Sequence, residues 1–159
     1  MYQFTIGVNV LRILVDADLI LEALMNRYNC VEDVSNLLDV AHPLVQIYIT
    51  DIGWQRISNY ISRLQNSQIA EIVINWLQEK IQICPVDNSI LQQARVSPLQ
   101  DFDSAVELVC VSDRLLHAIV THKPGNFADA PNKVVIWSMT ELWVRANLEM
   151  KYMYAGKVI

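Results

Sequence analysis

Five short segments that are mostly apolar alternate with longer segments that carry an apolar stripe at helical spacing. Strands that are apolar on both faces are typical of a parallel sheet covered by helices on each side. The pattern therefore predicts a three-layer α/β domain with a mostly parallel sheet of about five strands. The expected strands cover residues 10–15, 45–49, 81–86, 117–121 and 133–137.

The longer segments predict the helices, and they leave no convincing linker, internal repeat or low-complexity tract. The expected helices cover residues 18–26, 31–41, two stretches within 51–79, 88–95, 101–116, and a last segment from Met139. We therefore interpret residues 1–159 as a single domain, with a core of about 11–143 and a tail of about 151–159.

Composition and missing motifs exclude several classes of function. A net charge of −5 argues against a broad basic face for duplex DNA, although it leaves room for a local nucleic-acid groove. Three widely spaced cysteines favour buried thiols over disulfides or zinc. No signal peptide or membrane-length apolar run is present, so we expect a cytoplasmic protein without a membrane partner. Motifs for a hydrolase triad, a P-loop or a dinucleotide site are absent.

Acidic residues follow the predicted strands and open the predicted helices. Asp16 follows the first strand, Asp51 follows the second, and Asp101 and Asp103 open the apolar helix. Because parallel strands end at one edge of a sheet, these side chains are expected on the same rim. Clustered carboxylates repel one another unless a positive group lies among them, and an oxygen-only site suits Mg²⁺ or Mn²⁺. A second interpretation stays open, since each acid is also a plausible helix N-cap.

Three stretches of the sequence resemble the PIN-domain family. They are "ILVDADLILEALMNR", "YITDIGW" and "ARVSPLQDFDSAVELVCVSDRLLHAIVTHKPGNF". The family includes the toxin nucleases of bacterial toxin–antitoxin pairs and other metal-dependent ribonucleases. The resemblance implies that Asp16 is the primary ligand of Mg²⁺ or Mn²⁺, that Asp51 is a ligand or water-orienting base, and that Asp101 or Asp103 is the third acid. It also implies substrate contacts from Thr121, His122 and Lys123.

The sequence departs from the family pattern at three positions that usually carry acids. Ser104, His117 and Asn126 stand there, so we expect any Mg²⁺ or Mn²⁺ to bind weakly. Two functions therefore remain: a weak endoribonuclease of toxin type that cleaves single-stranded RNA, or a catalytically inactive PIN-fold binding module.

The resemblance and one apolar stripe predict protein partners. Ile69, Ile72, Val73 and Trp76 share one face of the helix expected over residues 67–80, and this face exceeds what a single core needs. We therefore expect a homodimer. The resemblance adds a small antitoxin protein as a second partner, and RNA as a partner of the active form.

Overall fold

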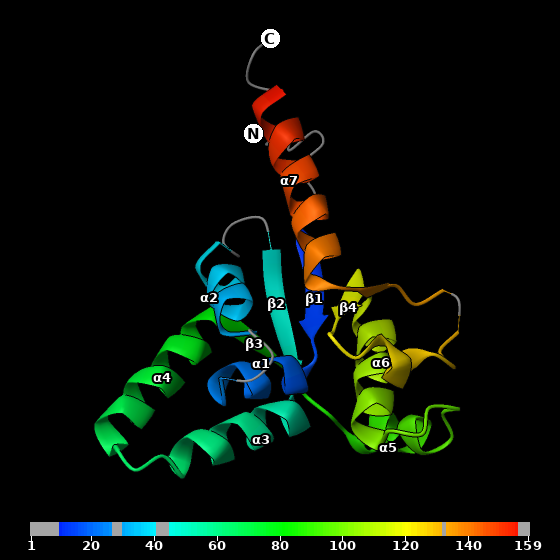
Figure 1. Cartoon of the computed structure of the whole chain (residues 1–159). Coiled ribbons are helices and arrows are strands. Elements are labelled where there is room, and N and C mark those ends of the chain that lie inside the picture. The colour runs from blue at the N-terminus through cyan, green and yellow to red at the C-terminus, as the bar shows by residue number, and fades with distance from the viewer. Residues whose placement is uncertain (1–9, 27–29, 41–44, 132, 156–159) are drawn as a thin grey trace, which may run out of the picture.

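A five-stranded sheet forms the middle of the computed structural model, which describes residues 10–26, 30–40, 45–131 and 133–155. The strand order is β3-β2-β1-β4-β5, and every pair of neighbours is parallel (Figure 1). The strands are β1 (Leu11–Val15), β2 (Val45–Thr50), β3 (Ile81–Cys84), β4 (Ala118–Val120) and β5 (Ile136–Trp137). The predicted α/β class is confirmed, with a sheet that is parallel throughout.

Helices occupy the stretches in which the sequence shows helical periodicity. They are α1 (Ala17–Leu24), α2 (Cys30–Val40), α3 (Asp51–Ser62), α4 (Ser67–Lys80), α5 (Asn88–Arg95), α6 (Phe102–Arg114) and α7 (Met139–Ala155), with a 3₁₀ turn, η1 (Pro124–Phe127). The first part of the predicted tail is helical, because α7 continues to Ala155. Residues 156–159 lie outside the described residues.

The two strands after α6 are shorter than the sequence predicts. Regular pairing covers residues 118–120 of β4 and 136–137 of β5. Single backbone hydrogen bonds continue the contact at both ends, from Ile119 N to Val135 O and from Thr121 N to Trp137 O. The apolar segments therefore run side by side as predicted, while strand geometry is limited to the middle of the first segment and the end of the second.

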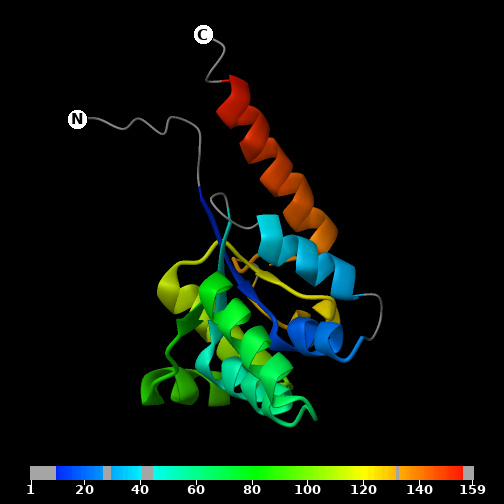
Figure 2. The same ribbon diagram turned by 90° about the vertical axis from the view of Figure 1, so that its left-hand side faces the viewer.

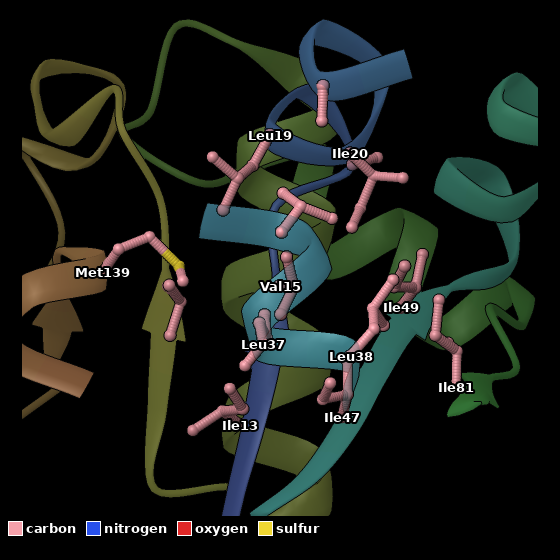
Figure 3. Packing of buried hydrophobic residues seen from close by; sticks show 14 of the residues in the cluster. Ile13, Val15, Leu19, Ile20, Leu37, Leu38, Ile47, Ile49, Ile81 and Met139 are labelled. Carbon is pink, nitrogen blue, oxygen red and sulfur yellow. The ribbon is translucent and has the colours of Figure 1, made fainter. Parts of the chain in front are cut away.

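One face of the sheet is covered by α1, α2, α3, α4 and the start of α7. Leu37 and Leu38 of α2 pack over β1 and β2, and Leu19 and Ile20 of α1 lie beside them (Figure 3). All four side chains are at most 1% exposed. Burial of each such side chain contributes about 1.5–3 kcal/mol, so this layer holds the end of β1 rigidly in place.

The other face is covered by α5 and α6. Leu14 of β1 and Ile119 of β4 pack against the apolar side of α6, as the composition of that segment predicts. Cys84 and Cys110 are buried free thiols, and burial raises the pKa of Cys110 to about 12. The side chain of Cys30 lies outside the described residues. Two helical layers with a sheet between them make the predicted three-layer arrangement.

Helix α7 leaves the sheet and extends beyond the rest of the domain (Figures 1 and 2). Its first turns are anchored, because Leu142 is fully buried and Ala146 is 7% exposed. Val144 and Leu148 on the same helix are exposed. No helix within the described ranges is both long and apolar enough to cross a membrane.

Candidate functional site

Asp16 lies at the carboxyl edge of the sheet, directly after β1, and only 4% of the residue is exposed. Its Oδ1 accepts a hydrogen bond from the backbone N of Asp18 at 3.1 Å, which makes Asp16 the N-cap of α1. Its Oδ2 accepts a 2.8 Å hydrogen bond from Thr121 Oγ1 at the end of β4. Burial raises the pKa of Asp16, and the hydrogen bond from Thr121 opposes that shift.

Glu107, in the middle of α6, brings a second buried carboxyl group to the same place. It is 3% exposed, and its Oε2 accepts a 3.2 Å hydrogen bond from the backbone N of Ala17. Within the described residues its Oε1 has no hydrogen-bond partner. Burial, and then the negative charge of Asp16, raise the pKa of Glu107 well above its ordinary value. Glu107 therefore keeps its proton to a higher pH than an ordinary glutamate does.

Arg56 of α3 supplies a positive charge between two carboxylates of the rim. Its Nη2 donates to Asp18 Oδ1 at 2.6 Å, and its Nη1 donates to Asp103 Oδ2 at 3.0 Å. Burial opposes the charged form, but the hydrogen bond to Asp18 and nearby acidic charges raise the pKa of Arg56. One guanidinium group thus joins the starts of α1 and α6 to α3.

The loop after β4 adds a second group of charges. Lys123 Nζ lies 3.0 Å from Glu22 Oε1 and 3.6 Å from Asp18 Oδ2. His122 Nε2 forms an ion pair with Glu22 Oε2 when the imidazole is protonated. The hydrogen bond to Glu22 raises the pKa of Lys123. Two of the three predicted substrate contacts, His122 and Lys123, therefore already interact with acidic side chains of α1.

Two of the other predicted acids, Asp51 and Asp101, form no ion pair with Arg56 or Lys123 within the described residues. Asp51 is the first residue of α3 at the same rim, and no described donor hydrogen-bonds to its carboxylate. Asp101 is exposed and caps α6, with Oδ2 accepting hydrogen bonds from Ser104 N at 3.0 Å and from Ser104 Oγ at 2.7 Å. Asp103, rather than Asp101, is the acid of this helix that joins the rim.

Two positions that usually carry acids lie away from Asp16 or face another cavity. His117 precedes β4, at the edge of the sheet opposite Thr121, and its Nδ1 accepts a 2.9 Å hydrogen bond from Arg12 N. Asn126 lies in η1 and lines an open polar pocket of about 430 Å³ together with Asp101 and Asp129. Neither side chain takes part in the hydrogen bonds of Asp16.

The sequence reasoning missed four residues of the rim: Asp18, Glu22, Arg56 and Glu107. The sequence does contain a signal for three of them. Asp18 stands two residues after Asp16, and Glu22 is one helical turn further along the same helix. Glu107 shares a helical face with Asp103. Arg56 gives no such signal. A clustered set of acids does require a positive group, but the sequence does not say whether a metal ion or a side chain provides it.

A narrow crevice runs between the starts of α1, α3 and α6. Its walls are Ala17, Thr50, Ile52, Gly53, Arg56, Asp103, Val106 and Glu107. The crevice leaves no room for a water-sized sphere, whereas Mg²⁺ keeps several waters when it binds a protein. In the part of the chain that the structure describes, no three Asp, Glu, His or Cys side chains are arranged to hold a metal ion. The crevice in this arrangement therefore has no space for a hydrated Mg²⁺ ion.

The fold and the position of the rim define an α/β domain with its candidate site at the carboxyl ends of parallel strands. Within this class, the chain belongs to the PIN domain family, whose sequence profile matches residues 12–123. The comparison with curated proteins found no match.

Solved structures of bacterial proteins share the fold. VapBC-1 from nontypeable Haemophilus influenzae aligns with a TM-score of 0.60 and 12% identity, over 82% of this chain and 99% of the other. VapBC2 from Rickettsia felis, bound to a promoter DNA fragment, gives 0.59 and 9%, over 80% and 98%. A toxin–antitoxin complex from Klebsiella pneumoniae gives 0.57 and 15%, over 79% and 96%. At these identities the likeness establishes the fold alone.

Proposed function

We propose that the chain is a PIN-fold interaction module that lacks metal-dependent nuclease chemistry. The observation that carries this proposal is the pairing of rim carboxylates with cations of the protein itself. Arg56 holds Asp18 and Asp103, and Lys123 holds Glu22. These pairs partly offset the charge that would otherwise attract a divalent ion, and the raised pKa of Glu107 disfavours a further negative charge there. We also propose that the protein is located in the cytoplasm.

An RNA cleavage assay tests this function. Single-stranded RNA is incubated with the protein and with Mg²⁺ or Mn²⁺, and an Asp16→Asn variant and a chelator serve as controls. We expect no cleavage above the level of the Asp16→Asn variant. Metal-dependent cleavage that disappears in the variant would contradict the proposal.

The second candidate function is a metal-dependent endoribonuclease of toxin type. It is favoured by the excess of acids at the rim, where five carboxyl groups face the two permanent cations Arg56 and Lys123. The five acids are Asp16, Asp18, Glu22, Asp103 and Glu107. In this function Asp16 and Asp103 would hold Mg²⁺ or Mn²⁺, Asp51 would orient water, and Thr121, His122 and Lys123 would contact RNA. The same cleavage assay decides between the two functions.

The partner that we propose for the module is a second copy of the chain, bound through α4. Of the predicted apolar stripe, Ile69 and Ile72 are 52% and 67% exposed. Val73 and Trp76 turn partly into the core. An antitoxin protein is a further proposed partner, supported by the likeness to the Klebsiella pneumoniae toxin–antitoxin complex. No surface of the chain is assigned to it.

A further inference from the structure

A guanidinium group occupies the place at the rim where a bound cation would neutralise acids from two helices. Arg56 reaches from α3 to Asp18 of α1 and to Asp103 of α6. We propose that the guanidinium group of Arg56 occupies a potential divalent-cation site formed by Asp18, Asp103 and Glu107. Replacing Arg56 by an uncharged residue should open this site to a hard divalent ion. The inference rests on the proposed function in one respect, because both take the rim of the wild-type protein to hold no metal ion.

The geometry around Arg56 supports a shared place for the two aspartates. Asp18 Oδ1 and Asp103 Oδ2 accept from nitrogens that are bonded to the same carbon atom, at 2.6 Å and 3.0 Å. The two oxygens therefore lie near one another although their residues come from different helices. Without the guanidinium, the two carboxylates lose the cation that they share and repel each other, and an ion between them removes that repulsion.

Glu107 provides an independent observation that points to a ligand. It lines the same crevice as Arg56 and Asp103. Its side chain is buried, and its Oε1 has no hydrogen-bond partner among the described residues. A buried carboxyl oxygen without a partner is costly, and contact with an ion in the crevice would satisfy it. Carboxylate oxygens are the ligands that Mg²⁺ and Mn²⁺ prefer.

The side chain has two advantages over an ion from solution. Arginine is charged at every relevant pH, and its planar fork can serve two carboxylates at once. It is also tethered, and a short tether gives an effective concentration in the range of about 1 mM or more. A divalent ion that binds the aspartates only weakly cannot displace it, so the wild-type rim excludes the ion.

The test is Mn²⁺ binding, measured by calorimetry with the metal alone. Arg56→Met removes the charge and keeps an unbranched apolar side chain, whereas Arg56→Lys is the matched control that keeps a cation. We expect Arg56→Met to bind Mn²⁺ about tenfold or more tightly than the wild type. Arg56→Lys should remain close to the wild type. Adding Asp103→Asn to Arg56→Met should abolish the gain.

Three results would overturn the inference: no gain in Arg56→Met, an equal gain in Arg56→Lys, or a gain that survives Asp103→Asn. Circular dichroism monitors folding, and Arg56→Gln replaces Arg56→Met if the latter does not fold. Failure of this inference is separable from failure of the proposed function. Metal-dependent RNA cleavage by the wild type contradicts the function and removes the premise that the wild-type rim is free of metal, whereas a missing Mn²⁺ gain contradicts only the inference.

Discussion

The hydroxyl group of Thr121 donates a 2.8 Å hydrogen bond to Oδ2 of Asp16, joining the residue after β4 to the residue after β1. Thr121 Oγ1 also accepts a 3.0 Å hydrogen bond from the backbone N of Lys123. Both Thr121 and Asp16 are almost fully buried. The Thr121 hydroxyl group therefore holds Asp16, the N-cap residue of α1, in place. It also stabilises the start of the loop that carries His122 and Lys123.

Replacement of Thr121 by Val should destabilise the protein. The valine has a similar shape but cannot donate to the buried carboxylate of Asp16, whose lost hydrogen bond costs about 1–3 kcal/mol. Urea unfolding at neutral pH measures the loss. Thr121→Ser keeps the hydroxyl group and should retain most of the stability. Equal losses in the two variants would show that the hydrogen bond to Asp16 contributes nothing.

The carboxyl group of Glu107 should make stability fall as pH rises. Its pKa in the folded protein lies well above the ordinary 4.5, so the folded state holds its proton where the unfolded state has released it. The stabilisation is complete below pH 4.5 and is lost as pH rises through the folded pKa. Between the unfolded and the folded pKa, each rise of one in pH removes about 1.4 kcal/mol of unfolding free energy.

Glu107→Gln tests this pH dependence, because the amide oxygen can still accept from the backbone N of Ala17 and cannot ionise. Unfolding free energies of both proteins are measured from about pH 4 to about pH 8, a range that starts near the ordinary pKa of glutamate. We expect the stability of the variant relative to the wild type to increase as pH rises. Parallel curves over the whole range would contradict a raised pKa for Glu107.

Gly53 allows the first turn of α3 to pack closely against the start of α1. A Cβ atom there would lie 2.9 Å from Ala17 Cβ and 3.0 Å from Thr50 Oγ1. Alanine normally stabilises a helix by about 1 kcal/mol relative to glycine. In this position the clash should outweigh that gain, and we expect Gly53→Ala to destabilise by about 1–3 kcal/mol in thermal unfolding.

A matched control is Gly125→Ala, because nothing lies within 4 Å of a Cβ atom at Gly125. Its melting temperature should stay close to that of the wild type. A melting temperature of Gly53→Ala at or above the wild-type value would show that α1 and α3 can separate without cost.

The exposed apolar face of α4 predicts that the protein forms a homodimer. Ile72→Glu places a charge on a side chain that is 67% exposed, so the fold should be unaffected while a dimer through this face dissociates. Sedimentation velocity should show a dimer for the wild type and a monomer for the variant. Val144→Glu, on the exposed side of α7, should leave the dimer intact. A monomeric wild type at high concentration would contradict the homodimer.

The fold was largely readable from the sequence, because strands apolar on both faces and helical stripes are local patterns. Strand β1 and the cap at Asp16 appear at the predicted junction. The lengths of β4 and β5 were less accessible. Strand pairing depends on which neighbouring backbone lies within hydrogen-bonding distance, and the hydrophobic pattern of residues 133–137 contains no such information.

The sequence by itself determined which elements form and that Asp16 and Asp51 stand at one edge of a parallel sheet. Only the tertiary structure decided which acids meet there. It separated Asp101, which caps α6, from Asp103, which faces Arg56, and it buried Glu107 beside Asp16. The reason is that a side chain's neighbours and solvation are set by how helices distant in sequence pack together. Arg56 and Asp103 are far apart in the chain, and their contact exists only because α3 and α6 begin at the same rim.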